Sequence, residues 1–249
     1  MNATIDFNCD LGEGMSNDEL IMPFLTSANI ACGGHAGNRD TMQQTIELAL
    51  RHGVAIGAHP SFPDRANFGR RDMLAEGLSL ETLQDALYDQ LHNLSTLCGQ
   101  HGATIHHLKP HGALYNRAAW DRELAAILIN ITNEFDSKLI IYALSGSELT
   151  KIAQQKGMQC YHEVFADRAY ADDGSLLPRS EPGALHEDPA RALAQSLRFA
   201  TEGKVETITG KLLQLKADTL CIHGDGSMAA HFAKLIHDGL LAKGVRIKA

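Results

Sequence analysis

The segment 104–116 places ionisable side chains at alternate positions. His107, Lys109 and His111 are spaced two apart, and residues two apart share one face of a β-strand. Pro110 cannot donate a ladder hydrogen bond, so it predicts the end of that strand. Imidazole and ammonium groups at a strand end suit metal binding, anion binding or proton transfer. The segment therefore predicts part of a binding or catalytic site.

Four other predicted strands also carry polar residues on one face near their ends. These strands cover residues 4–10, 28–35, 54–60 and 219–225. Their polar residues are Asp6, Asn8 and Asp10, then Asn29 and His35, then His59, and finally His223 with Asp225. An unpartnered polar group inside a barrel costs about 1–3 kcal/mol. Repetition on five strands therefore favours one shared site, with His107, one step deeper, as a packed support.

Histidine and aspartate together suit two kinds of chemistry. Asp10, His59 and His111 are the candidate ligand trio for a divalent metal. No local HExxH-type motif supports this assignment. Proton transfer by the same side chains, with Lys109 holding an anion, explains the pattern equally well. Both interpretations stay open on the residues alone.

Arginines in the predicted loops are candidates for binding an anionic substrate group. Arg70 and Arg71 lie in a loop predicted over residues 61–78, and Arg168 and Arg179 follow a strand predicted near 159–165. Guanidinium groups bind carboxylate and phosphate in bidentate fashion. Long loops in compact domains often form binding segments.

The chain has no evident nucleotide cradle. It contains no GxxxxGK[ST] segment, and the turn after the first strand, Gly12-Glu13-Gly14, lacks dinucleotide-binding spacing. The segment 224–227, before a predicted helix, could offer backbone N–H groups to a phosphate.

Predicted strands and helices alternate along the chain. Further strands are predicted near 139–144 and 159–165, and a small hairpin within 205–213. Helices are predicted at 18–25, up to 52, from 79, and at 121–135, 147–156, 189–202 and 227–241. This alternation implies parallel pairing. The prediction is one α/β domain, residues 1–249, forming an irregular (β/α) barrel of about seven parallel strands. An open doubly wound sheet is the alternative, although it ordinarily carries a glycine-rich first turn.

Composition limits the classes of partner. The chain has 249 residues, 44% of them hydrophobic, and a net charge of -8. Acidity argues against nucleic acid or an anionic membrane as the main partner. Five widely spaced cysteines predict neither a disulfide framework nor a cysteine zinc site. No signal-like segment or apolar run of about 18 residues is present, so a cytoplasmic protein is expected.

Seven ordered motifs resemble those of the LamB/YcsF family. They are the segments 8–14, 27–33, 57–60, 68–71, 109–116, 165–168 and 223–225, and the resemblance runs from residue 5 to about 245. The sequence departs from the family pattern at Gly34, Asn38 and Asn67, where an aromatic residue, Asp and Gly are usual.

The resemblance implies a barrel of the glycoside hydrolase/deacetylase type. It also implies hydrolysis of the small molecule 5-oxo-L-proline to L-glutamate, coupled to ATP hydrolysis, in a 5-oxoprolinase with partner subunits B and C. A five-membered lactam is stable and needs activation before it opens. Because this chain lacks a nucleotide cradle, ATP is expected to act through the partner subunits.

On this expectation the predicted site residues form two sets. The catalytic set is Asp10, His59, Lys109, His111 and Asp225, and the substrate-binding set is Asn8, Glu13, Asn29, His35, Arg70, Arg71, Asp167, Arg168, Arg179 and His223. Asp10 or His59 would activate water. Lys109 and Arg70 would hold carboxylate or phosphate, and His111 would protonate the leaving nitrogen. The alternatives are a stand-alone metal-dependent deacetylase or amidohydrolase, and a binding subunit without catalysis.

Overall fold

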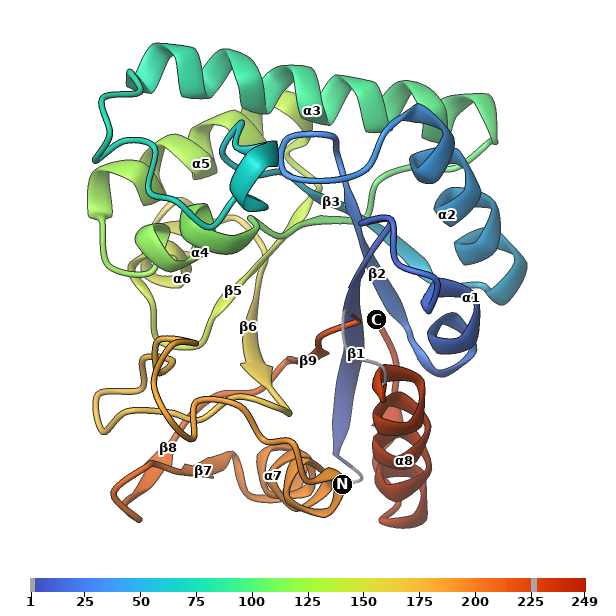
Figure 1. The fold of residues 1–249 in the computed structure, drawn as a ribbon, viewed down its shortest axis with the longest axis vertical. Coiled ribbons are helices and arrows are strands. Elements are labelled where there is room, and N and C mark those ends of the chain that lie inside the picture. Colours follow the sequence, from blue (N-terminus) through green and yellow to red (C-terminus); the bar gives the residue numbers. More distant parts are fainter. Residues whose placement is uncertain (1–2, 225–227) are drawn as a thin grey trace.

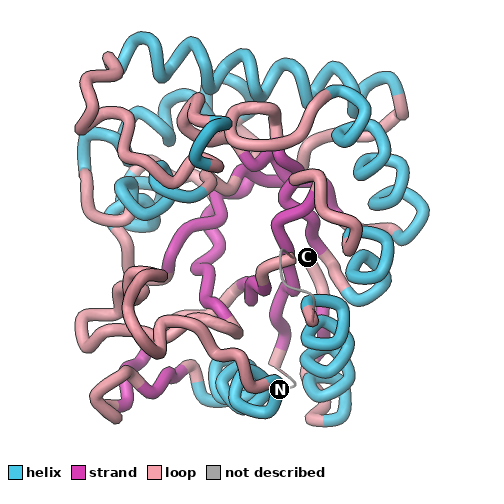
Figure 2. Tube along the Cα trace, viewed as in Figure 1, coloured by secondary structure: helices cyan, strands magenta, loops and turns pink. Residues whose placement is uncertain are grey.

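Seven parallel strands form a closed barrel in the computed structural model, which describes residues 3–224 and 228–249. The strands are β1 (Thr4–Leu11), β2 (Ser27–Ala31), β3 (Ala55–His59), β4 (His107–Leu108), β5 (Ile140–Leu144), β6 (Cys160–Phe165) and β9 (Thr219–Ile222). They pair in that order, and β9 closes the barrel against β1. The tube view shows these strands surrounding the centre of the molecule (Figure 2). The predicted barrel of about seven parallel strands is confirmed.

Helices surround the barrel (Figure 1). They are α1 (Asp18–Ile21), η1 (Met22–Phe24), α2 (Arg39–His52), η2 (Arg65–Asn67), α3 (Leu80–Gln100), α4 (Gly112–Ala118), α5 (Arg122–Asp136), α6 (Glu148–Gln155), α7 (Pro189–Glu202) and α8 (Ala229–Ala242). The predicted hairpin is present as the antiparallel pair β7 (Lys204–Glu206) and β8 (Leu212–Gln214). Three short elements were not predicted, namely η2, α4 and β10 (Arg246–Ile247). Strand β10 pairs with the start of β1. No helix in the described part of the chain is long and apolar enough to cross a bilayer.

Local sequence signals explain where helix α2 begins and ends. The Asn38 side chain accepts hydrogen bonds from the backbone N–H groups of Asp40 and Thr41, and the Thr41 hydroxyl accepts one from the Asn38 N–H. This is a reciprocal N-cap. Gly53 ends the helix at a φ of 67°, a left-handed conformation that glycine adopts readily. Asn38 therefore supplies the N-cap of this helix.

Strand β1 alternates between an apolar and a polar face, as predicted. Ile5, Phe7, Cys9 and Leu11 belong to the buried hydrophobic core, while Asp6, Asn8 and Asp10 make polar contacts across the barrel interior. The prediction that Asp6 joins a strand-end site is wrong. Asp10 lies four positions further along the strand, a rise of about 13 Å. Its carboxylate instead accepts hydrogen bonds from Thr26, Ser27 and Thr219.

Strands β2, β4 and β9 are shorter than predicted. Strand β9 ends at Ile222, so His223 lies just beyond it. Strand β2 ends at Ala31, so His35 lies in the loop that follows rather than on a strand. Gly33 in that loop has a φ of 93°, which is incompatible with continued extension. Strand β4 contains only His107 and Leu108.

Gly57 in β3 makes room for a buried histidine. A Cβ atom at position 57 would lie 2.0 Å from Nε2 of His107. That ring is fully buried, hydrogen-bonds through Nε2 to Oδ1 of Asn29 at 2.7 Å and stacks on Tyr142 at 3.9 Å. The prediction that His107 is a packed support is confirmed.

Candidate active site

A cavity of about 650 Å³ is lined by residues at the carboxyl ends of the barrel strands and in the loops beyond them. The predicted site residues in its lining are Asp10, Glu13, His59, Arg70, Lys109, His111, Arg168, Arg179 and His223. Aromatic residues of the lining include Phe68, Tyr115, Trp120 and Phe165. Ligand sites in parallel barrels usually lie at this end.

Lys109 forms the floor of the cavity and is paired with two carboxylates. Its ammonium lies 2.9 Å from Asp10 Oδ1 and 2.9 Å from Glu163 Oε1. It also lies 3.1 Å from Cys221 Sγ, and its own exposed fraction is 2%. Burial opposes its charge, but Asp10, Cys221 and Glu163 together hold the pKa of Lys109 well above its usual value. The ammonium is therefore better placed to hold Asp10 than to bind a substrate anion.

Asp10 is held as a carboxylate facing the cavity. Asn29 Nδ2 donates to Asp10 Oδ1 at 2.8 Å, and Oδ2 lies 3.4 Å from His59 Nε2. Burial alone would raise the pKa of Asp10, but His59 and Lys109 outweigh it and keep that pKa well below its ordinary value. Asn29 also donates to Asn8 Oδ1 at 2.8 Å. Asn8 and Asn29 thus support the floor from below.

His59 and His111 turn one ring nitrogen each toward the other. Nδ1 of His59 lies 2.8 Å from the carbonyl oxygen of Lys109, and Nε2 of His111 lies 3.0 Å from that of Phe68. A carbonyl oxygen only accepts, so both of these nitrogens must donate. In the neutral rings, His59 Nε2 and His111 Nδ1 therefore both carry lone pairs. They are only 2.9 Å apart.

Glu13 and His35 complete this cluster. Glu13 Oε1 lies 3.0 Å from His35 Nε2, 3.5 Å from His111 Nδ1 and 4.0 Å from His59 Nε2. The His35 ring stacks on His111 with a centroid distance of 3.6 Å. Burial lowers the pKa of His35 to about 3. Within the described chain, its buried Nδ1 has no hydrogen-bond partner.

A tight turn carries the carbonyl group that fixes His111. Phe68 has a φ of 56°, and Gly69 follows at 64°. A Cβ atom on Gly69 would lie 2.9 Å from the Cβ of His35, so only glycine fits there. Asn67 Nδ2 donates to Asp64 Oδ1 at 2.8 Å. Asn67 therefore braces this turn.

The opposite side of the cavity carries positive charge. Arg168 donates to the Leu177 carbonyl at 2.5 Å, while its buried Nε has no hydrogen-bond partner among the described residues. Arg179 lines the same side. Nearby, Nδ1 of His223 lies 2.8 Å from Asp167 Oδ2. Burial would raise the pKa of Asp167, but His223 and the two arginines lower it.

Arg71 lies away from this cavity. Arg71 makes an ion pair with Glu76 at 2.5 Å, its side chain is 54% exposed, and it does not belong to the cavity lining. The prediction that it binds substrate in this cavity is therefore not supported by its position. Asp225 lies outside the described residues.

Glu163, the second carboxylate on Lys109, was not predicted from the sequence. Both of its oxygens are buried and, within the described chain, lack a hydrogen-bond partner other than this ion pair. The Tyr115 hydroxyl is likewise buried, and the carboxylate of Glu163 raises its pKa further than burial alone. A signal was present in the sequence, since residue 163 shares a strand face with Phe165, which lines the cavity.

The profile of the LamB/YcsF family matches residues 5–249. The chain belongs to the LamB/YcsF family. Relatives in this family include the 5-oxoprolinase A subunit of Bordetella parapertussis, 46% identical over the full length of both chains. That of Bacillus licheniformis is 45% identical over 98% of each chain.

Solved structures agree with the family assignment. A lactam utilization protein from Thermus thermophilus superposes with a TM-score of 0.92 at 39% identity over 99% of both chains. The peptidoglycan deacetylase PdaC of Bacillus subtilis superposes with a TM-score of 0.51 at 12% identity, covering 99% of this chain and 87% of that one. This second likeness concerns the fold alone. It agrees with the expected deacetylase-type barrel.

Proposed function

We propose that this chain is the A subunit of a 5-oxoprolinase and opens the lactam ring of 5-oxo-L-proline to give L-glutamate. The observation that carries the substrate assignment is full-length identity of 44–46% to relatives with that name. The cavity, with carboxylate, imidazole and guanidinium groups in its lining, suits a small anionic amide.

The proposal includes ATP and two partner subunits, B and C. An unactivated lactam is a poor electrophile, and phosphorylation of its oxygen would make the ring carbon open to attack by water. The sequence contains no P-loop motif. The partner subunits would therefore use ATP to activate the lactam, and this chain would hydrolyse the activated species.

In this reaction Asp10 acts as the general base. Its Oδ1 is held by Lys109 and Asn29, which leaves Oδ2 directed to the side of His59. A carboxylate fixed in this way can accept a proton from water as the water oxygen adds to the ring carbon. Lys109 positions the base.

His223 supplies the proton for the leaving nitrogen. Asp167 accepts a hydrogen bond from its Nδ1, which orients the ring and leaves Nε2 for the substrate. As the C–N bond breaks, the nitrogen takes this proton and the ring opens to γ-glutamyl phosphate. A second water then hydrolyses this acyl phosphate to glutamate and inorganic phosphate. His111 is less suited to this role than expected from the sequence, because its Nε2 proton is donated to the Phe68 carbonyl.

Arg168 is the proposed site for the substrate carboxylate or the phosphoryl group. Its guanidinium lines the cavity, and its buried Nε–H has no partner in the described part of the chain. A buried donor left without a partner costs about 1–3 kcal/mol, which a bound anion would recover.

Reconstitution tests this function. Purified subunits B and C are assayed for 5-oxoproline-dependent ATP hydrolysis and for glutamate release, with and without this chain. We expect glutamate only when the chain is present. Full-rate glutamate release by B and C alone would exclude the proposal. Turnover of N-acetylated sugars by this chain alone, abolished by a chelator, would instead favour the stand-alone deacetylase.

A further inference from the structure

The cluster of Glu13, His35, His59 and His111 offers four ligand atoms that all lie within 4.8 Å of one another. Two neutral imidazoles with lone pairs facing at 2.9 Å repel each other. Something positive must lie between these nitrogens or beside them. The candidates are a shared proton and a metal cation.

The hydrogen bonds behind the two imidazoles favour a metal. Metal-binding histidines almost always donate their other ring N–H to a backbone carbonyl or a carboxylate, which fixes the tautomer and the ring orientation. His59 does so to the Lys109 carbonyl, and His111 does so to the Phe68 carbonyl. Both rings are thus oriented before any ion is bound.

The spacing of the atoms also suits a metal. A tetrahedral ion with ligands at about 2.0–2.1 Å separates those ligands by roughly 3.4 Å. Glu13 Oε1, His59 Nε2 and His111 Nδ1 are separated by 2.9, 3.5 and 4.0 Å. Small side-chain shifts would bring all three onto one ion.

His35 fits a supporting role better than a ligand role. Its ring is stacked on His111 at 3.6 Å with an interplanar angle of 2°. Imidazole lone pairs lie in the ring plane, so two parallel rings at this distance cannot both direct a lone pair at one ion. His35 Nε2 instead donates to the Glu13 carboxylate at 3.0 Å and orients it.

We propose that Glu13, His59 and His111 bind one divalent transition-metal ion of the zinc type, with His35 as the residue that positions Glu13. Two imidazoles and one carboxylate suit Zn²⁺ and its first-row neighbours rather than Mg²⁺ or Ca²⁺, which prefer oxygen ligands. Three protein ligands leave a coordination position open, as in catalytic metal sites. The ligand set differs from the predicted trio in one member, since Glu13 takes the place of Asp10.

The test measures metal binding directly, without an activity assay. Full-length protein is stripped with a chelator and titrated with Zn²⁺ and with Co²⁺, whose visible spectrum reports imidazole coordination. We expect one ion per chain in the wild type. Binding should be lost in His59→Ala and His111→Ala. In His35→Ala the ion should bind about 10- to 100-fold more weakly, as for other residues that orient ligands.

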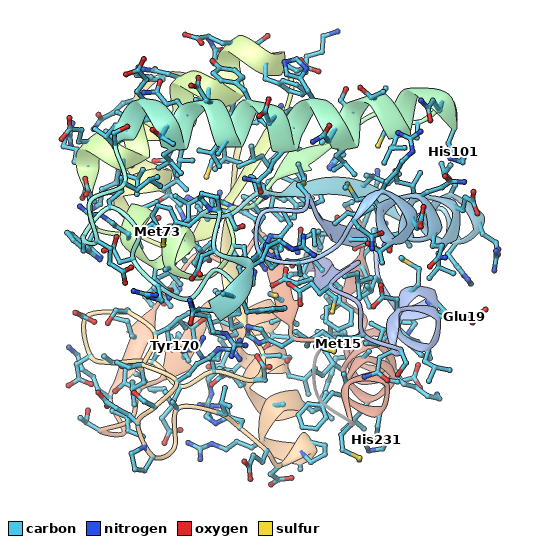
Figure 3. All side chains as sticks on the ribbon, turned by 45° about the horizontal axis from the view of Figure 1, so that its top comes forward. Met15, Glu19, Met73, His101, Tyr170 and His231 are labelled. Atoms are coloured by element: carbon cyan, nitrogen blue, oxygen red, sulfur yellow. The ribbon has the colours of Figure 1, made fainter. Side chains whose placement is uncertain are left out.

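The matched control is His231→Ala. His231 is exposed on α8 and lies at the outside of the molecule, where Figure 3 labels it. The His231→Ala variant should bind metal like the wild type. The proposal would be overturned if the wild type did not bind one metal ion per chain, or if His59→Ala and His111→Ala bound metal as fully as the wild type. If the wild type binds no metal, a shared proton between the two rings is the remaining explanation.

A second measurement does not depend on the folding of the variants. X-ray absorption of the zinc-loaded wild type should show two imidazole ligands at about 2.0–2.1 Å. A spectrum with oxygen ligands alone would overturn the proposal even if every alanine variant failed to fold.

Discussion

Replacing Lys109 by methionine should strongly destabilise the protein. The ammonium is 2% exposed and contacts Asp10 and Glu163 at 2.9 Å each. Methionine keeps much of the volume but leaves both carboxylates without this cation. Removing one partner of a buried ion pair costs about 3–5 kcal/mol. We expect a loss in that range, because Lys109 is the only ion-pair partner of Glu163 among the described residues.

The assay is urea unfolding followed by circular dichroism, in the presence of a chelator so that metal binding does not contribute. Lys234→Met is the matched control. Its ammonium pairs with Asp238 on the surface, where the lysine side chain is 61% exposed. Exposed pairs within a helix contribute about 0.3–0.5 kcal/mol. The control should therefore lose far less stability than Lys109→Met.

A double variant tests the cause. Adding Glu163→Gln to Lys109→Met removes one of the uncompensated charges. The loss of stability in the double variant should therefore differ from the sum of the losses in the two single variants by about 1–3 kcal/mol. Additive losses would refute the view that Lys109 neutralises the buried carboxylates. So would a loss no larger than that of Lys234→Met. A lysine that served only to bind substrate would change KM and leave the stability of the free protein unaltered.

Three further predictions concern the barrel and the anion-binding side. Gly57→Ala should lower the free energy of unfolding, measured in urea, by about 1–3 kcal/mol, because the alanine Cβ would overlap the buried His107 ring. Unchanged stability would contradict this close packing. Burial raises the pKa of Asp6 despite its hydroxyl partners. The pKa of Asp6 is higher in the folded protein than the value of about 3.9 in the unfolded chain. The contribution of Asp6 to the free energy of unfolding is therefore most favourable below about pH 3.9, and it is lost as the pH rises through the folded-state pKa. The stability of Asp6→Asn relative to the wild type should therefore increase as the pH rises above about 3.9. A stability difference in urea unfolding that does not vary with pH would refute this. Arg168→Met should raise the KM for 5-oxoproline in the reconstituted complex by about tenfold or more, as expected for loss of a charged hydrogen bond. The control, Arg71→Ala, should leave KM unchanged. Equal effects of the two substitutions on KM would contradict the placement of the anion site at Arg168.

The barrel could be predicted because strand periodicity is a local property. In β1, polar residues at positions 6, 8 and 10 alternate with apolar ones, and the structure places the two sets on opposite faces. Parallel pairing follows from the alternation of strands and helices, and it brings Asp10, His59 and Lys109 together.

The remaining details depend on loop geometry and on side-chain partners. Glu13 returns to the site because the turn after β1 has left-handed glycines at Gly12 and Gly14, which periodicity cannot reveal. The Phe68 carbonyl fixes the tautomer of His111 only because of the turn at Gly69. Such tertiary contacts revise the expected acid role of His111.

In the proposed reaction the lactam ring opens at this barrel mouth with Asp10 as the base. The most direct test is glutamate release by the reconstituted complex carrying Asp10→Asn, with Asp85→Asn, an exposed change on α3, as the control. We predict that Asp10→Asn slows glutamate release about 10²- to 10⁴-fold, while the subunits still assemble and the control keeps the wild-type rate. Glutamate release at the wild-type rate by the Asp10→Asn complex would contradict the claim.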